Sequence, residues 1–445
     1  MQKSTSTLFL LVVLIVQGFF SCFLTGFAFA QSTPNVYFGV DIAYGQTAEA
    51  KAAIDRVSSF TNLAIIGSTG VVWFQDRVNE TYQYAYDKGL SIISLRPSLP
   101  EFSMTDLNAS EWYSMAESRW GNRLLGFYVG DEQGGKQLDG IFQYTGGANF
   151  SGVPGSYVDA AGAFTAGVRG FLQYTKPPSY YKTITSDYAL YWYDFKAGYD
   201  VVWTELGGNW SQQVNIALCR GAAEAQGKEW GAIITWSYTQ QPYIENATQL
   251  YQDLLLAYDN GAKYIIIFDS DTHGHSILQS DHIDAMQKFW SYIQNHQPRS
   301  NYPKSERIAY VIPNGYGFGF RWPTDHIWGV WQPDELTPNI TKSVGSLLDQ
   351  YNGKLDILID DGLQSGNNGY NQLLYWNSYY PAPTPTQLQS PTLTPTSTVT
   401  QLSEAPSSTI IIIIVTIVAI IAVASLVFVT YLKKQKDKQP EHKKL

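Results

Sequence analysis

Cysteine is almost absent from this chain of 445 residues, which holds only Cys22 and Cys219. Because Cys22 falls in a predicted signal peptide, a mature chain would keep Cys219 alone and could form no internal disulfide. Cys219 lies on the apolar side of a predicted helix, so a buried thiol is favoured over a reactive nucleophile. The fold must therefore be held together by packing and hydrogen bonds.

Charge is also scarce, and positive charge most of all. Charged residues make up 15% of the chain. Between the predicted signal peptide and the predicted cytoplasmic tail, 22 Lys and Arg stand against 36 Asp and Glu, a net charge of −14. Such a chain repels phosphate backbones and offers no basic stripe to nucleic acid. The GxSxG and HExxH patterns are absent as well, and no cofactor is predicted.

The two ends of the chain are predicted to direct it to a membrane. Residues 1–30 combine an early lysine, an uncharged apolar stretch and the small-x-small sequence Ala28-Phe29-Ala30, which is typical of a signal peptide. Residues 409–432 include 23 consecutive uncharged residues, enough at about 1.5 Å per residue to span a bilayer core of roughly 30 Å. Six lysines in the tail, residues 433–445, place the C-terminus in the cytoplasm. We therefore expect a single-pass protein of the cell membrane with an extracellular body.

The segment before the predicted membrane span has its own composition. Residues 381–408 are dominated by Pro, Thr, Ser and Gln, which bury no core and favour an extended stalk. Six Asn-x-Ser/Thr sequences in the body are consistent with an exported glycoprotein, at Asn79, Asn108, Asn149, Asn209, Asn246 and Asn339.

Residues 31–300 alternate short apolar runs with amphipathic helical stretches. Most runs are apolar on both faces, as parallel strands covered by helices are. Eight strand–helix units fit a (β/α)8 barrel of about 250 residues, although an open doubly wound sheet has the same local pattern. The barrel is favoured because the strand count reaches eight and stops. The predicted strands are Val36–Val40, Asn62–Ile66, Ser91–Leu95, Leu124–Val129, Thr183–Thr185, Tyr199–Thr204, Gly231–Trp236 and Lys263–Phe268.

Residues 301–380 give a further β-α-β pattern and predict a small α/β domain, a flavodoxin-like fragment. Its sequence PNGYGFGF suggests a phosphate-binding loop, but the glycine spacing is wrong for one. A packing loop rich in glycine and aromatic residues is favoured instead. The predicted elements are a strand at Arg307–Ile312, a helix around Ser343–Tyr351, and strands at Leu355–Ile359 and Leu373–Tyr375.

Acidic residues collect where the predicted strands end, which in a barrel is the rim that holds the active site. Solvated turns and helix caps would account for some of these acids, but carboxylates at five of eight ends favour a functional cluster. The residues at the ends are Asp41, Arg96, Asp131, Glu132, Asp187, Glu205, Trp236, Tyr238, Asp269 and Asp271.

Several carboxylates beside aromatic rings are what hydrolysis of a glycosidic bond requires. One carboxylic acid protonates the leaving oxygen, while a second carboxylate attacks the anomeric carbon or activates water. Aromatic rings stack on sugar faces, and the chain has 13 Trp and 31 Tyr. The predicted catalytic residues are Glu132, Glu205 and Asp131, and the predicted substrate-binding residues are Asp41, Arg96, Tyr128, Trp210, Trp236, Tyr238, Asp269, Asp271 and His273.

A metal site is the competing interpretation of one loop. The sequence DSDTHGHS, residues 269–276, offers two carboxylates and two imidazoles, which are common metal ligands. Their spacing brings the ligands to one side only in an extended loop. A solvated or substrate-contacting loop is favoured, and no metal is predicted.

The motifs GFYVGDE, DVVWTELGG and IITWSY, at the ends of strands four, six and seven, resemble those of glycoside-hydrolase-type barrel proteins over about residues 36–297. The resemblance implies an acid/base at the end of strand four, here Glu132, and a second carboxylate elsewhere on the rim. The chain departs from the largest clan of such barrels at Asp131, where that clan has Asn, and at Trp236, where it has its nucleophilic Glu. Residues 301–380 are weakly similar to the α/β domain that follows the barrel in some β-galactosidases.

Two residues compete as the carboxylate that faces Glu132. Glu205 is two strands away and has the longer side chain, whereas Asp269 is across the opening, so Glu205 is favoured. Glu205 could instead cap the helix that begins near Ser211. A carbohydrate-hydrolysing enzyme is therefore expected, and a non-catalytic glycan-binding or cell-envelope protein on the same scaffold is the alternative.

Overall fold

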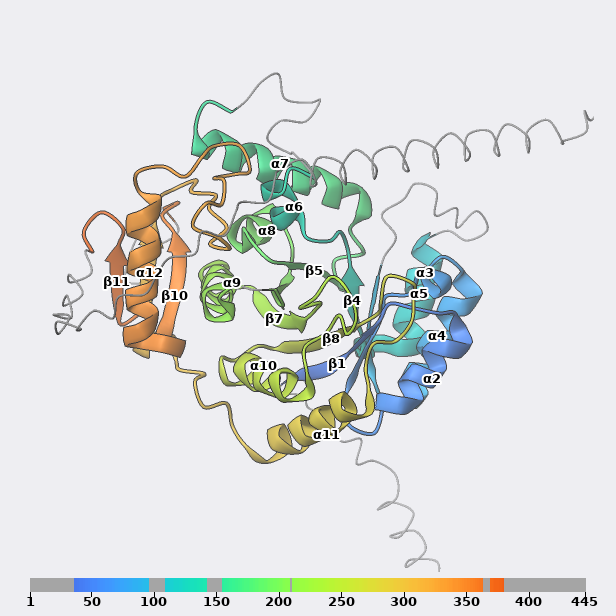
Figure 1. Ribbon diagram of the computed structural model, residues 1–445. Helices are drawn as coiled ribbons and strands as arrows, with labels where there is room; N and C mark the ends of the chain where they lie inside the picture. Colours follow the sequence, from blue (N-terminus) through green and yellow to red (C-terminus); the bar gives the residue numbers. More distant parts are fainter. Residues whose placement is uncertain (1–35, 96–108, 142–153, 209, 363–368, 380–445) are drawn as a thin grey trace, which may run out of the picture. The chain divides into compact units, whose positions relative to one another are not determined.

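Eight parallel strands close into a barrel in the order in which they occur along the chain (Figure 1). The computed structural model describes residues 36–95, 109–141, 154–208, 210–362 and 369–379. The open doubly wound sheet is therefore excluded, and the predicted (β/α)8 barrel is confirmed. The barrel strands are β1 (Tyr37–Ile42), β2 (Leu63–Ile66), β3 (Ser91–Leu95), β4 (Leu124–Tyr128), β5 (Lys182–Asp187), β6 (Val201–Leu206), β7 (Glu229–Ile234) and β8 (Tyr264–Asp269).

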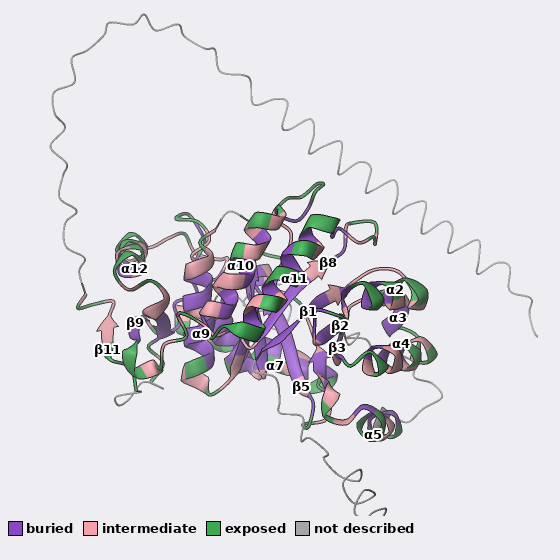
Figure 2. Ribbon diagram, turned by 90° about the horizontal axis from the view of Figure 1, so that it is seen from below, coloured by how far each residue is buried: buried purple, intermediate pink, exposed green. Residues whose placement is uncertain are grey.

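Helices surround the strands and bury their apolar faces against them, while their outer faces are exposed (Figure 2). Side-chain oxygens of Ser156, Ser211 and Asn246 cap the helices that follow them, as expected of residues that satisfy free backbone N–H groups. The helices are α2 (Thr47–Val57), α3 (Thr69–Val72), α4 (Gln75–Asp87), α5 (Ala109–Trp120), α6 (Gln133–Leu138), α7 (Tyr157–Thr175), α8 (Tyr191–Ala197), α9 (Gln212–Gln226), α10 (Ala247–Asp259) and α11 (Ser280–Asn295), with short 3-10 turns at Gly121–Arg123, Lys304–Glu306 and Asn352–Lys354.

The inside of the barrel is filled by side chains rather than by solvent. Alternate strand residues point inward and form one apolar cluster, which includes the fully buried Trp203. At the N-terminal end of the barrel, Glu229 pairs with Lys182 and Lys263 and accepts a hydrogen bond from Tyr264. These polar pairs lie at the N-terminal end of the barrel, opposite the rim at which the strands end.

A small parallel sheet follows the barrel, with strand order β10–β9–β11 and helix α12 (Figure 1). It packs on α9, where Gly221 brings the helix backbone against β10: a Cβ at residue 221 would lie 2.6 Å from the carbonyl oxygen of Ile357. The fully buried Asp356 joins the two parts through ion pairs to Arg220 (2.7 Å) and Arg307 (2.9 Å). Barrel and small sheet belong to one compact unit. The elements are β9 (Ile308–Ile312), α12 (Thr337–Tyr351), β10 (Leu355–Ile359) and β11 (Gln372–Tyr375).

Most predicted strands differ from those observed by one or two residues at an end, and two of these differences bear on the site. The predicted fifth strand is too short, because the buried polar residues Thr183, Ser186 and Asp187 interrupt its apolar pattern. The seventh begins two residues earlier than predicted and ends at Ile234, so Trp236 lies in the loop beyond it. Within the described part of the chain, no helix is long and apolar enough to cross a bilayer. The predicted signal peptide, stalk, membrane span and tail lie outside the described residues, as does Arg96.

Candidate active site

Glu132 occupies an unusual backbone position immediately before α6. Its φ of 54° and ψ of 43° are left-handed, a conformation that is rare for residues other than glycine and that often accompanies function. The surrounding contacts hold it there. The Glu132 N–H donates to the Ser186 carbonyl at 3.1 Å, and the Glu132 carbonyl accepts from the Lys136 N–H at 2.8 Å.

The buried carboxylate of Asp187 anchors the segment that carries Glu132. Its two oxygens accept hydrogen bonds from the N–H groups of Gly134 (2.6 Å) and Gly135 (2.8 Å) at the start of α6, and from the N–H groups of Tyr188 and Ala189. Burial, together with the nearby Glu132 charge, raises the pKa of Asp187 to about 7 despite these donors. Asp187 therefore ties the end of β5 to the loop that follows β4.

Glu205 lies near the end of β6 with its side chain directed into the barrel mouth, and the residue is 7% exposed. Ser186 donates to its Oε1 at 2.7 Å from the neighbouring strand β5. The α9 helix is capped by Ser211 and not by Glu205, so the capping alternative is wrong. The carboxyl group can thus face the mouth.

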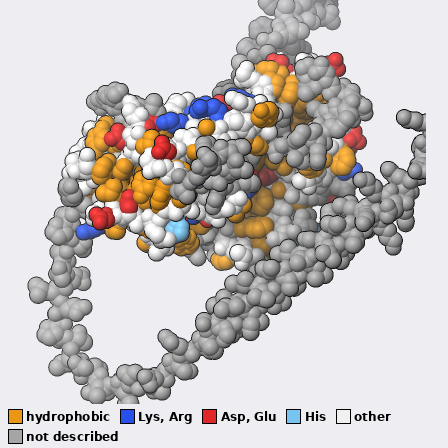
Figure 3. All heavy atoms as spheres, turned by 90° about the horizontal axis from the view of Figure 1, so that it is seen from above, with side chains coloured by type: hydrophobic (Ala, Val, Ile, Leu, Met, Phe, Trp, Pro, Cys, Tyr) orange, Lys and Arg blue, Asp and Glu red, His pale blue; other side chains and the backbone are white. Residues whose placement is uncertain are grey.

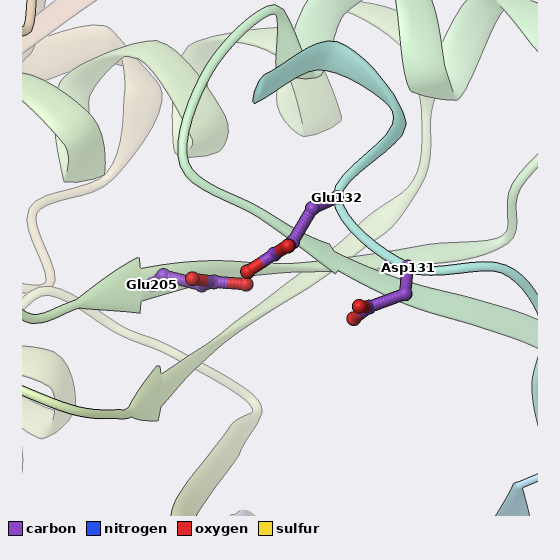
Figure 4. A group of neighbouring side chains, drawn as sticks. All are labelled: Asp131, Glu132 and Glu205. Atoms are coloured by element: carbon purple, nitrogen blue, oxygen red, sulfur yellow. The ribbon is translucent and has the colours of Figure 1, made fainter. Parts of the chain in front are cut away.

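Glu132 and Glu205 point toward one another across the rim (Figure 4). One carboxyl oxygen from each lies within 4.8 Å of the other and of a carboxyl oxygen of Asp131. Asp131 faces a different set of partners: Tyr128 donates to its Oδ1 at 2.6 Å, and Lys136 pairs with its Oδ2 at 2.7 Å. The two glutamates are therefore the directly paired carboxyl groups.

The electrostatic surroundings differ between the two glutamates. Burial, followed by the charges of Glu132 and Asp131, raises the pKa of Glu205 well above its usual range. Burial and Asp131 also raise the pKa of Glu132, but Lys136 at 3.2 Å opposes the shift. The lysine favours the ionised form of Glu132, so the proton that the pair shares belongs on Glu205.

Asp41 brings a further carboxyl group to the top of the barrel from β1. Its Oδ1 is buried and has no hydrogen-bond partner among the described residues. Burial, with smaller effects of Asp131 and Asp269, raises its pKa to about 8. An acid with this pKa is neutral at neutral pH and can donate a hydrogen bond to a ligand.

The predicted aromatic residues fall into two groups. Trp210 stacks on Tyr188 with ring centroids 5.8 Å apart, in the loop that follows β6 and Glu205. Trp236 packs on Tyr243 at 5.1 Å and donates to the Ser270 carbonyl, so it belongs to the loops after β7 and β8. Tyr238 is 53% exposed in the same region.

The residues predicted in the loop after β8 are engaged with the loop itself. Asp269 Oδ1 accepts from the N–H groups of Ile277 (2.7 Å) and Leu278 (3.2 Å), and Ser276 donates to both its oxygens. The Asp271 carboxylate accepts a hydrogen bond from the N–H of His273, and this bond closes a turn. The residue His273 is exposed. Among the described residues, no hydrogen bond connects this loop to Glu132 or to Glu205.

Three residues of the site are not among the predicted site residues. Lys136 follows Glu132 by four positions, one turn of a helix, which is a spacing that could have identified it. Ser186 is the register partner of Trp203 on β6 and faces the barrel interior. The sequence does not reveal this, because β5 carries several hydroxyl side chains and shows no alternation of polar and apolar residues. Asp187 is predicted as a strand end without a role, because sequence alone does not reveal its backbone partners.

Among the described residues, Asp131, Glu132 and Glu205 also form the group best placed to hold a cation. Carboxylate oxygens are ligands for hard divalent metals. The Lys136 ammonium already pairs with two of the three carboxylates, so a metal ion would have to displace it.

No family model matches the chain, and no curated protein sequence matches it. Among solved structures it is similar to a variant of GH5_18 from Streptomyces cattleya in complex with Manβ1-4GlcNAc, at 11% identity and a TM-score of 0.47 over 77% of this chain and 99% of that chain. It is also similar to GH5_18 from the same organism in complex with GlcNAc, at 12% identity and a TM-score of 0.46 over 78% and 100% of the two chains. Alpha-L-fucosidase isoenzyme 2 from Paenibacillus thiaminolyticus has 11% identity and a TM-score of 0.42 over 76% of this chain and 59% of that chain. Similarities of this size say nothing about the reaction, and the barrel is established by its own closed strand order.

Proposed function

We propose that this chain is a membrane-anchored glycoside hydrolase that acts outside the cell with Glu132 and Glu205 as its paired carboxyl groups. The observation that carries the proposal is the close approach of these two carboxyl groups at the C-terminal rim of the barrel. The location follows from residues 1–30 as signal peptide, 381–408 as stalk and 409–432 as membrane span.

The surroundings of the two carboxyl groups assign a role to each. Glu205 is buried and has no cationic partner among the described residues, which favours its protonated form, so it is the general acid that protonates the leaving oxygen. Glu132, ionised beside Lys136, is the carboxylate that attacks the anomeric carbon. This reverses the role that the sequence motif implies for Glu132, because the motif carries no information about Lys136.

The short separation favours one stereochemical outcome. Retaining enzymes place their carboxyl groups about 5–5.5 Å apart, whereas inverting enzymes need about 6.5–9.5 Å to hold a water molecule. The nearest oxygens of Glu132 and Glu205 lie within 4.8 Å, which leaves no room for the intervening water of the second class. We therefore expect the product to keep the anomeric configuration of the substrate, which NMR of the fresh product can measure.

The role assignment predicts different behaviour for the two glutamine variants on chromogenic aryl glycosides. Glu205→Gln should lose about 10²- to 10⁴-fold in kcat/KM on substrates with poor leaving groups and much less on dinitrophenyl glycosides, whose departure needs no general acid. Glu132→Gln should lose activity on both, and azide should restore it by forming a glycosyl azide. Steady-state kinetics and product NMR provide the measurement.

Two outcomes would count against the proposal. Unchanged turnover in Glu132→Gln would remove this residue from the reaction. Absence of hydrolysis by the unaltered protein across a broad glycoside panel, with glycan binding retained, would favour the non-catalytic glycan-binding alternative.

A further inference from the structure

A loop of the small domain crosses onto the barrel next to the candidate active site. It runs from β9 through residues 313–331 and meets α6, the helix that begins directly after Glu132. The side-chain amide of Gln137 donates to the Trp328 carbonyl at 2.9 Å, and a Cβ at Gly329 would lie 2.5 Å from the Gln137 carbonyl oxygen. The loop therefore lies in close contact with the helix. Within the segment PNGYGFGF, a Cβ at Gly317 would lie 2.3 Å from Cε2 of Trp328, in agreement with the predicted packing role of that segment.

An ion-pair network fixes the far end of this loop. The Arg321 guanidinium, 7% exposed, pairs with Asp325 within the loop (2.7 Å) and with Asp139 at the end of α6 (2.8 Å). Asp139 also accepts from the Tyr188 hydroxyl at 2.6 Å, and Arg321 lies over the Tyr188 ring. Both arms of the guanidinium are used, which holds the backbone of its neighbour, Trp322, in one place.

Trp322 completes an aromatic corner. Its ring meets Trp210 edge to face, with centroids 6.1 Å apart and planes at 74°, and Trp210 in turn stacks on Tyr188. Tyr188 is buried and Trp210 is half-buried, whereas Trp322 remains 45% exposed. The space-filling view in Figure 3 shows one face of the molecule, on which hydrophobic side chains gather in groups between isolated charges. The aromatic corner beside Asp139 has the same mixed character.

The chemistry of the corner suits a sugar ring better than an apolar ligand. One exposed indole face offers a stacking surface, and the 40% exposed Asp139 carboxylate at its edge accepts hydrogen bonds from hydroxyl groups. The corner is built on α6 and on the loop after β6, the two segments that also position Glu132 and Glu205. A glycan chain that enters the rim at the two glutamates thus meets the corner a short way further on.

We propose that Trp322, supplied by the small domain, forms a distal subsite with Trp210 and Asp139 that binds a second or later sugar unit of an extended glycan. The inference rests on the proposed function, since it adds chain-length selectivity to the same site. The small domain then has a role, because it contributes part of the glycan-binding surface next to the barrel.

The test compares substrates of increasing length. The substrates are oligosaccharides of three or more units that the protein hydrolyses, and the corresponding aryl monoglycoside. Trp322→Ala should raise the KM for the oligosaccharides about 10-fold more than the KM for the monoglycoside, which is the scale of one stacking contact. Trp322→Phe should restore most of the difference because it keeps a ring. Tyr174→Ala is the matched control, since Tyr174 is 89% exposed on α7 at the opposite end of the barrel and should change neither value.

A binding measurement separates this inference from the proposed function. Calorimetry of cello-, manno-, galacto- and chito-oligosaccharides with Glu132→Gln protein, with and without Trp322→Ala, requires no turnover. A roughly 10-fold weaker affinity for the longer members supports the subsite even if the unaltered protein hydrolyses nothing. Equal effects of Trp322→Ala on long and short ligands, in a variant with unchanged circular dichroism, would overturn the subsite even if hydrolysis is established.

Discussion

At the scale of single residues, the structure buries carboxyl groups with raised pKa values below the rim of the barrel. Asp194 on α8 is fully buried, and burial together with the neighbouring Asp187 raises its pKa well above its usual range. A buried carboxyl group of this kind stays protonated in the folded chain while it ionises in the unfolded chain above a pH of about 4. The folded state then binds more protons, so stability falls as pH rises through this range.

Asp194→Asn should remove this contribution. Relative to the unaltered protein, the variant should gain up to about 1.4 kcal/mol of unfolding free energy for each pH unit above roughly 4, until the pKa of the folded state is reached. Urea denaturation of both proteins at pH 5, 6, 7 and 8 measures the difference. Stability curves that run parallel over this range would show that Asp194 ionises equally in both states.

At the scale of elements, α6 depends on a glycine that cannot be replaced without strain. A Cβ at Gly135 would lie 2.1 Å from Cζ of Tyr188, whose ring is buried and stacked on Trp210, so neither partner can move freely. Gly135→Ala should cost about 1–3 kcal/mol as an overpacked site does, and it should lower kcat because Glu132 precedes the same helix.

A matched glycine provides the comparison for this variant. Gly162 is exposed on α7, and a Cβ added there would meet nothing within 4 Å, so Gly162→Ala should stabilise the protein by about 0.5–1 kcal/mol. Chemical denaturation and kinetics of both variants give the result. Should Gly135→Ala match Gly162→Ala in both measurements, the contact with Tyr188 places no constraint on the site.

Elements are also what the sequence predicted best. The apolar pattern located all eight barrel strands and β10 of the small sheet, because strands buried on both faces show an uninterrupted run. The rim residues Glu132 and Glu205 followed from their place at strand ends. Their close approach, the pairing of Lys136 and the anchoring by Asp187 could not follow, since they depend on the left-handed backbone at Glu132. The contact of Trp322 with Trp210 joins segments more than a hundred residues apart.

At the scale of the whole molecule, the barrel and small sheet should behave as one body. The buried Asp356 of the small domain pairs with Arg220 of α9, and separating the two parts would leave Arg220 without this partner. The proposed topology places this body outside the membrane on the stalk of residues 381–408.

Protease added to intact cells should therefore cut in the stalk. It should release one fragment that contains both the barrel and the small sheet and leave a short fragment in the membrane. Immunoblots of the medium and membranes with antibodies to each end provide the measurement. A body that is protected from protease would contradict the topology, and release of the barrel without the sheet would contradict the single unit.

The close approach of Gly135 to Tyr188 has a consequence for recognising relatives of this chain. A side chain added at residue 135 would occupy the space of the Tyr188 ring, so the sizes of these two residues can change only together. In an alignment of homologues the two columns would covary: a larger residue at the first requires a smaller one at the second. The segment DEQGG, followed by a tyrosine 53 positions after its last glycine, is thus a fingerprint with a steric basis. In this chain the same contact fixes the start of the helix that follows Glu132 at the barrel mouth.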